Sequence, residues 1–314
     1  MKNLFTFVLL LTLGTVFFSC QDAEDDCIYV DKRRCDPDFV LPDITGTDTT
    51  STDSTDGIIT LASPITNYDE KILLEDFTGF RCTNCVPATV TAVNLKAAHP
   101  NRLSIVGVHC TPFFAAPLTS DTTQPYHSDF RTPEGEQFFD YYEMAGLPNG
   151  AINRLGSQGN KYIPFAEWTD RINALIAENN PEVYISIENI TVDEENQELI
   201  VKVYAKPLIP SETAYLINLS VTESGIADAQ KNSSSPGGQI LDYVHNHVYR
   251  GSAYGPWGID VFNGNIDLNT NEVLSLKLKI DINTEWNLEN CEILVFISKS
   301  SNREVVQVEE AHIL

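Results

Sequence analysis

The sequence predicts an α/β domain followed by an all-β sandwich domain. In the first part, a short apolar segment leads into Cys82-Thr83-Asn84-Cys85, and a helix-compatible run follows it. After Asn180-Pro181 the spacing changes, and the chain alternates apolar and polar residues between turns, which is typical of strands. A folded region of about 255 residues is long for one mixed core, so we expect a domain boundary near Asn180.

The first strand, at residues 71–78, ends in a tight turn at Gly79 and a Cys-x-x-Cys motif. Downstream apolar residues recur with a spacing compatible with a helix that ends before His99-Pro100; they are Val86, Val90, Ala92, Val93, Leu95, Ala97 and Ala98. Cys82 would then lie at the helix N-terminus, where free N–H groups and the helix dipole favour a thiolate. Redox proteins present a reactive dithiol in this way.

A strand at 103–109 is followed by a long, aromatic-rich segment, residues 111–146. Thr132-Pro133, with Glu134 and Glu136 in the next turn, predicts a helix start. Two interpretations remain open. The segment is either a lid that forms a hydrophobic groove over Cys82, or a second helix layer whose aromatic side chains are core.

These residues resemble the thioredoxin fold. Asp76 and Phe77 precede Cys82 as in thioredoxins, and Leu147-Pro148 occupies the place of the cis-proline loop. A hairpin at 151–163 and a helix at 165–179 complete the order of that fold. The resemblance implies that Cys82 is the nucleophile, Cys85 the resolving thiol and Asp76 the proton acceptor, with Pro148 facing the dithiol. Arg81 and Thr83-Asn84 depart from the usual tryptophan and glycine-proline.

The second part predicts about seven strands and no helix, which favours an antiparallel, immunoglobulin-like β-sandwich. The expected strands are residues 183–192, 198–205, 214–223, 240–249, 273–282, 291–298 and 303–313. His245 and His247 would alternate along one strand and share a face. With no third ligand nearby, we expect a role in packing or at the domain interface and no metal site.

The N-terminus predicts export. Residues 1–19 have one cation and an apolar core too short to span a membrane, so they read as a signal peptide. The segment before Cys20 resembles a lipoprotein cleavage box, which implies that Cys20 carries a lipid and that the protein is anchored in the outer membrane. Residues 20–57 are acidic and rich in Thr, Ser and Asp, and we expect a disordered tether. The folded domains would then span 58–180 and 181–314.

The chain carries a formal net charge of -24, which makes nucleic acid an unsuitable partner because phosphate would be repelled. Membrane contact should therefore come from the lipid, and the expected partners are protein clients or a surface partner. No cofactor is expected.

Of the seven cysteines, Cys20 is assigned to the lipid, which leaves six in an oxidising compartment. Cys27 with Cys35 and Cys82 with Cys85 are the simplest pairs. Cys110 and Cys291 remain, and a bridge between them would clamp the two domains together.

The strand-loop LLEDFTGFRCTNC and the segment YVHNHVYRG together resemble the outer membrane protein 28 family. Two hypotheses about function stay open. The first is an outer-membrane-anchored thiol-disulfide oxidoreductase that acts on exported proteins. The second is a non-enzymatic, adhesin-type surface-binding lipoprotein that uses the same fold as a scaffold.

Overall fold

The computed structural model describes residues 57–66, 68–262 and 266–314. The predicted signal peptide, Cys20, Cys27, Cys35 and nearly all of the tether lie outside these residues. No helix within the described part of the chain has the length and apolar character needed to cross a membrane.

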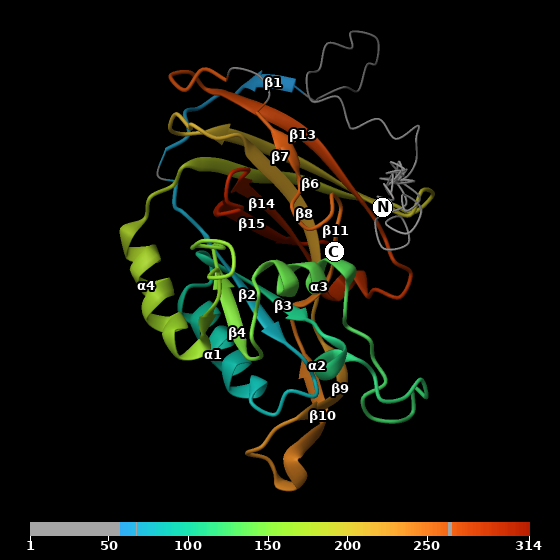
Figure 1. The fold of residues 1–314 in the computed structure, drawn as a ribbon. Coiled ribbons are helices and arrows are strands. Elements are labelled where there is room, and N and C mark those ends of the chain that lie inside the picture. Colours follow the sequence, from blue (N-terminus) through green and yellow to red (C-terminus); the bar gives the residue numbers. More distant parts are fainter. Residues whose placement is uncertain (1–56, 67, 263–265) are drawn as a thin grey trace, which may run out of the picture. The chain divides into compact units, whose positions relative to one another are not determined.

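The first part of the chain forms the predicted elements in the predicted order (Figure 1). They are β2 (Ile72–Thr78), α1 (Cys85–Ala98), β3 (Leu103–His109), α2 (Pro112–Ala115), α3 (Pro133–Tyr141), β4 (Asn149–Ile152), β5 (Ile163–Pro164) and α4 (Trp168–Glu178). β2 and β3 are parallel, β4 is antiparallel to β2, and β5 pairs with β4. β2 is buried along its whole length because helices cover both faces of the sheet.

Alternation along β2 defines two sides of the sheet. On the α1 side, Ile72 and Leu74 pack against α1 and α4. On the α3 side, Leu73 and Phe77 pack against the aromatic side chains of α3. Neighbouring residues of β2 therefore belong to different cores.

The buried face of α1 differs from the apolar stripe that the sequence suggested. Val90 and Val93 are 52% and 43% exposed, whereas the helix packs on the sheet through Ala88, Ala92 and Leu95. Apolar residues occur on both faces of this helix, so their spacing alone did not identify the side that meets the sheet.

The long segment between β3 and β4 contributes aromatic side chains to two cores. Phe138 and Tyr142 are buried on the α3 side, and Tyr126 and Phe130 are buried against Phe80. The helix start is as predicted, because the Thr132 hydroxyl accepts a hydrogen bond from the Gly135 N–H. The aromatic side chains at and after α3 agree with a second helix layer, whereas Tyr126 and Phe130 are buried from a segment without helix and Phe113 is exposed.

The second part is β-rich, as predicted. Its strands are β6 (Val183–Asp193), β7 (Glu198–Pro207), β8 (Tyr215–Glu223), β9 (Ile226–Lys231), β10 (Gln239–His245), β11 (Val248–Ser252), β12 (Ile259–Val261), β13 (Glu272–Asp281), β14 (Cys291–Lys299) and β15 (Val305–His312). A four-stranded sheet, in the order β1 (Gly57–Thr60), β13, β7, β6, shares a core with side chains of β8 and β14.

One large sheet joins strands from both sides of residue 180. Its order is β15-β14-β8-β11-β3-β2-β4-β5, with β12 also paired to β8. β11 makes the connection, because it is parallel to β3 and antiparallel to β8. The domain limits at residue 180 stay a prediction, and the hydrogen-bonded sheet is continuous across them.

The strand expected at 240–249 is two strands. β10 ends at His245 and β11 starts at Val248, and His247 between them has a positive φ of 53°. β10 pairs with β9 in a separate two-stranded sheet, the β9–β10 hairpin. This hairpin extends to the end of the molecule where α2 and the start of α1 lie (Figure 1).

Candidate functional site

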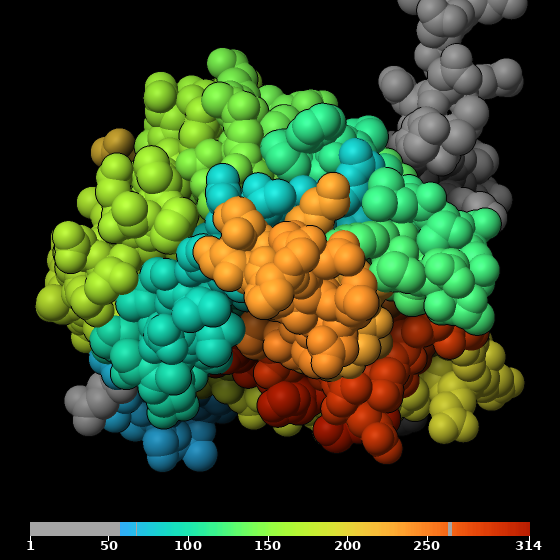
Figure 2. Space-filling view, turned by 90° about the horizontal axis from the view of Figure 1, so that it is seen from below, coloured from blue at the N-terminus to red at the C-terminus, as the bar shows by residue number. Residues whose placement is uncertain are grey.

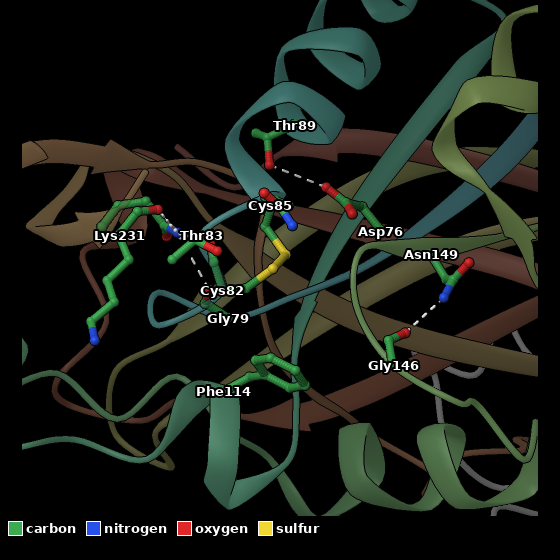
Figure 3. Close-up of a disulfide and its surroundings, with 12 residues drawn as sticks. Asp76, Gly79, Cys82, Thr83, Cys85, Thr89, Phe114, Gly146, Asn149 and Lys231 are labelled. Carbon is green, nitrogen blue, oxygen red and sulfur yellow. Dashed lines mark hydrogen bonds between the residues drawn. A yellow bond between two sulfur atoms is a disulfide. The ribbon is translucent and has the colours of Figure 1, made fainter. Parts of the chain in front are cut away.

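Cys82 and Cys85 form a disulfide, with Cys85 as the first residue of α1 and Cys82 in the turn before it (Figure 3). Gly79 makes this turn possible, because a Cβ there would lie 2.6 Å from the Phe114 carbonyl oxygen. The same carbonyl accepts a hydrogen bond from the Arg81 N–H at 3.0 Å. The turn is thus fixed against α2, and Cys82 lies just outside the helix whose N-terminus it was expected to occupy.

The disulfide is nearly enclosed, since Cys82 and Cys85 are only 3% and 1% exposed. The β9–β10 hairpin supplies much of the cover. The Lys231 N–H donates to the Phe80 carbonyl at 2.7 Å, and the Ser233 N–H donates to that of Thr83 at 3.1 Å. In Figure 2 the hairpin, in orange, lies between α1 and the segment that follows β3.

Gln230 fastens the hairpin directly to the cysteine turn. Its side-chain amide donates to the Cys82 carbonyl at 3.1 Å and to the Gly79 carbonyl at 3.4 Å. A segment from the β-rich part of the chain therefore closes the dithiol site. Sequence reasoning missed this contact, because β9 is short and polar and was not recognised as a strand.

Asp76 lies behind the disulfide on the α1 side of β2 (Figure 3). Its Oδ2 accepts a hydrogen bond from the Thr89 hydroxyl at 3.3 Å, whereas Oδ1 has no hydrogen-bond partner among the described residues. Burial raises the pKa of Asp76 to about 7, against the opposing effect of the Thr89 hydrogen bond. A carboxyl group with this pKa can take up or release a proton near neutral pH.

Asp76 and Cys85 line the same small cavity, which lies between α1, the sheet and the β9–β10 hairpin. The cavity has a volume of about 20 Å³, enough for about one water molecule. His109 from β3, with Tyr243 and His245 from β10, also lines it. The site therefore combines residues that are far apart in the sequence.

His109 and His245 are buried next to each other, with their ring centroids 5.5 Å apart. The Phe130 ring lies 4.9 Å from each. Burial lowers the pKa of His245 to about 4, partly opposed by the charge of Asp228. Burial, with a contribution from His245, holds the pKa of His109 well below its ordinary value. Both imidazoles are therefore neutral at pH 7.

His245 and His247 do not alternate along one strand as expected, because the strand breaks between them. The Nδ1 atom of His247 lies 3.5 Å from a carboxylate oxygen of Glu292. Within the described ranges, no group of His, Cys, Asp and Glu is arranged to hold a metal ion.

The Leu147-Pro148 peptide bond is cis and directly precedes β4. The Asn149 side-chain amide closes this loop by donating to the Gly146 carbonyl at 2.7 Å. Figure 3 shows Gly146 and Asn149 on one side of the disulfide, with Thr83 and Lys231 on the other.

The Cys110 to Cys291 bridge is absent, and both residues are buried free thiols in the described structure. The sheet explains why, because Gly107, Val248, Glu223 and Cys291 lie in one row across β3, β11, β8 and β14. Three strand spacings of about 4.8 Å put β3 and β14 about 14 Å apart. A disulfide requires Cα atoms within about 7 Å. The continuous sheet, and not a disulfide, therefore joins the strands near Cys110 and Cys291.

A second buried carboxylate, Glu75, lies on the α3 side and was not singled out in the sequence. Arg154 contacts it with Nη2 at 2.6 Å, and the Tyr142 hydroxyl donates to it at 3.0 Å. The guanidinium carbon is 4.8 Å from the centroid of the Phe138 ring and 5.0 Å from that of Phe296. Two adjacent acids in an apolar strand were the signal that could have revealed this cluster.

Comparison with solved structures finds a likeness to HBP35 of Porphyromonas gingivalis, with a TM-score of 0.58 and 14% identity over 79% of this chain and 76% of that one. At this identity the likeness shows the fold alone. A protein of Agrobacterium tumefaciens gives a TM-score of 0.47 and 12% identity, over 79% of this chain and 96% of that one. A domain of the outer membrane lipoprotein Omp28 from P. gingivalis gives 0.28 and 16%, over 42% of this chain and 88% of that one. No curated protein matches.

A family model described as outer membrane protein Omp28 matches residues 135–314. This range covers more than half of the chain, including most of α3 and all elements from β4 to β15, whereas the Cys82–Cys85 turn lies before it. The resemblance seen in the sequence is therefore confirmed at the level of the family. The chain belongs to the Omp28 family of outer membrane lipoproteins.

Proposed function

We propose that this lipoprotein carries out thiol-disulfide exchange with exported proteins through Cys82 and Cys85. The observation that carries the proposal is the cavity that Asp76 and Cys85 share. A buried carboxyl group beside the second cysteine supplies the proton acceptor that the resolving thiol needs.

We also propose that the region around this site is thioredoxin-like. Support comes from parallel β2 and β3, antiparallel β4, the cis peptide at Pro148 and the position of α1 after the cysteine turn. β11 adds a strand parallel to β3. In this interpretation the C-terminal part of the chain extends the sheet of the minimal fold beyond β3.

The exchange would run as follows from the reduced form. The Cys82 thiolate attacks one sulfur of a client disulfide, which forms a mixed disulfide and releases one client thiolate. Asp76 takes the proton of Cys85, whose thiolate then attacks the Cys82 sulfur and releases the second client thiolate. Two electrons pass to the client, and a dithiol reductant restores the pair. Since each step is reversible, the disulfide form can instead oxidise a client dithiol.

The test uses the full chain in detergent with a disulfide-containing peptide as client. Wild-type protein should exchange with it, Cys82→Ser should be inactive, and Cys85→Ser should accumulate a mixed disulfide. A reduction potential between about -120 and -270 mV would agree with an exchange catalyst, and one below about -300 mV would contradict it. Inactive wild-type protein would also overturn the proposal.

A second function is favoured by one observation, the near-complete burial of both sulfur-bearing residues. A buried disulfide is typical of a structural crosslink, and the protein would then be a non-enzymatic surface-binding lipoprotein. The matched variant is Cys82→Ser with Cys85→Ser. Its binding to host or bacterial cell surfaces should equal that of the wild-type protein, provided that the circular dichroism spectrum is unchanged. Loss of binding in the folded variant would contradict this function.

A further inference from the structure

Buried polar atoms without a partner concentrate at one place in the described structure. Among the described residues, seven buried side-chain nitrogen or oxygen atoms have no hydrogen-bond partner. Four of these seven atoms belong to residues of the cavity behind Cys85. They are Asp76 Oδ1, His109 Nδ1, His109 Nε2 and His245 Nε2. An unpaired buried polar atom is costly, so a cluster of four requires a physical explanation.

The strand register explains how these residues converge. Asp76 pairs with Gly107 in the parallel β2–β3 ladder, and Thr78 pairs with His109. Because side chains alternate along a strand, Asp76 and His109 lie on the same side of the sheet, under α1. His245 reaches this side from the end of β10.

Gly107 allows the β10 end to approach. Its N–H donates to the His247 carbonyl at 2.7 Å, and a Cβ at this position would lie only 3.2 Å from the same oxygen. A larger residue at this position would therefore require the segment that carries His245 to shift by a few tenths of an ångström. The polar chamber depends on this contact between distant parts of the chain.

The geometry of the chamber suits a water molecule. Its volume of about 20 Å³ exceeds the space that one water needs, and three of its side chains offer unpaired polar atoms. A neutral imidazole has one donor and one acceptor nitrogen, whereas a carboxylate only accepts. One water can therefore donate to Asp76 and still bond to an imidazole.

We propose that Asp76, His109 and His245 share one buried water, and that the two histidines are positioning residues that stabilise the Asp76 carboxylate as it exchanges a proton with Cys85. The role in exchange rests on the proposed function. The proton leaves the Cys85 thiol for Asp76 in one direction and returns in the other. The histidines stay neutral throughout and act through the water.

The charged and titratable groups around the chamber fit this role. Asp228 of β9 raises the pKa of His245, and Arg250 of β11 lowers the pKa of His109. Tyr243 of β10 faces Thr89 and Asp76. His247 lines the chamber but is paired with Glu292. None of these groups gives Asp76 a direct hydrogen bond in the described structure, where its bonding partner is Thr89. A hydrogen bond from the water would therefore add to the one that the carboxylate accepts from Thr89.

The test follows the titration of Asp76 in the oxidised full chain in detergent, by carbon NMR of aspartate carboxyl groups assigned with Asp76→Asn. His245→Leu removes a hydrogen-bonding group that bonds to the water, so the pKa of Asp76 should rise by about one unit, a tenfold change in its acid dissociation constant. His245→Gln keeps a polar side chain and should restore most of the shift. His312→Leu, at an exposed histidine of β15, is the matched control and should change nothing.

An unchanged titration in His245→Leu would overturn the proposal, as would a crystal structure at high resolution without water in the chamber. If His245→Leu fails to fold, the titration of Asp76 in His109→Gln and the crystal structure of the wild-type protein still test the proposal. The titration is measured without any client. If the pKa of Asp76 shifts in His245→Leu but the wild-type protein has no exchange activity, the proposed function is rejected and the water site is kept. If the wild-type protein exchanges disulfides but the pKa does not shift, the water site is rejected and the proposed function is kept.

Discussion

Glu75 and Asp76 are adjacent in β2, and both are buried carboxyl groups, but they have different partners on the two sides of the sheet. On the α3 side Glu75 is held by the Arg154 guanidinium and the Tyr142 hydroxyl. On the α1 side Asp76 has the Thr89 hydroxyl alone at 3.3 Å, and one of its oxygens is unpaired among the described residues.

The difference separates a carboxylate that is paired with a cation from a carboxyl group that is not. A buried anion that is paired and fully hydrogen-bonded stays charged and holds the elements around it together. A buried carboxyl group without a cation has a raised pKa and can exchange a proton near pH 7. Strand alternation alone put these two environments on neighbouring residues.

The largest expected effect is on the α3 side. Arg154→Met leaves Glu75 as an uncompensated buried charge, so the free energy of unfolding should fall by about 3–5 kcal/mol. Urea denaturation at pH 7 measures it. Lys279→Met is the control. Lys279 is half-exposed, so its ion pair with Glu198 should contribute only about 0–1 kcal/mol to the free energy of unfolding. Equal losses in the two variants would contradict the structural role of the Glu75 pair.

On the α1 side, Asp76→Asn should stabilise the protein in a pH-dependent way. The pKa of Asp76 is about 7 in the folded chain and about 3.9 when unfolded, so folding favours the neutral acid. The contribution of Asp76 to wild-type stability is therefore fully present below about pH 4 and is lost as the pH rises to about 7. Three pKa units correspond to about 4 kcal/mol, which is the most that the variant can gain at pH 8.

Urea denaturation of both proteins at pH 4 and pH 8 checks this sign. The control is Asp129→Asn, because Asp129 lies near the surface and is paired with Arg131. A stability difference between Asp76→Asn and the wild-type protein that is the same at both pH values would mean that Asp76 is not the buried acid inferred here.

The cover over the α1 side gives a smaller effect. Gln230→Ala removes the amide that ties the β9–β10 hairpin to the cysteine turn, a loss of about 1 kcal/mol or slightly more. After reduction, alkylation of Cys82 should be about tenfold faster than in the wild-type protein, as followed by mass spectrometry. Gln137→Ala, at an exposed position of α3, should leave the rate unchanged. An unaltered rate in Gln230→Ala would show that the hairpin does not limit access.

The smallest effect is expected on the outer face of α1. Val90→Thr should change the free energy of unfolding by less than about 0.5 kcal/mol, because this side chain is exposed. Ala92→Val, on the packed face of the same helix, should cost about 1–3 kcal/mol through overpacking. Thermal denaturation distinguishes the two variants. A larger loss of stability in Val90→Thr than in Ala92→Val would mean that the buried face of α1 is the one that the sequence suggested.

Much of the first part could be predicted from the sequence because its signals are local. The strand before Gly79, the helix that ends at His99 and the Thr132 cap each depend on a few consecutive residues. The cysteine pair and Asp76 could be named for the same reason, since their spacing is fixed within one strand and one turn. Seven strand regions of the second part were found from alternation, although one of them proved to be two strands.

By itself, then, the sequence determined the order of the elements, the dithiol motif and the family resemblance. The tertiary structure decided which side of α1 is buried, that β11 joins two sets of strands, and that the β9–β10 hairpin closes the site. It also brought His109 and His245 to Asp76 and kept Cys110 away from Cys291. The physical reason is that these features depend on pairing between segments that lie from about 30 to more than 100 positions apart, and apolar periodicity within a segment does not encode its partner.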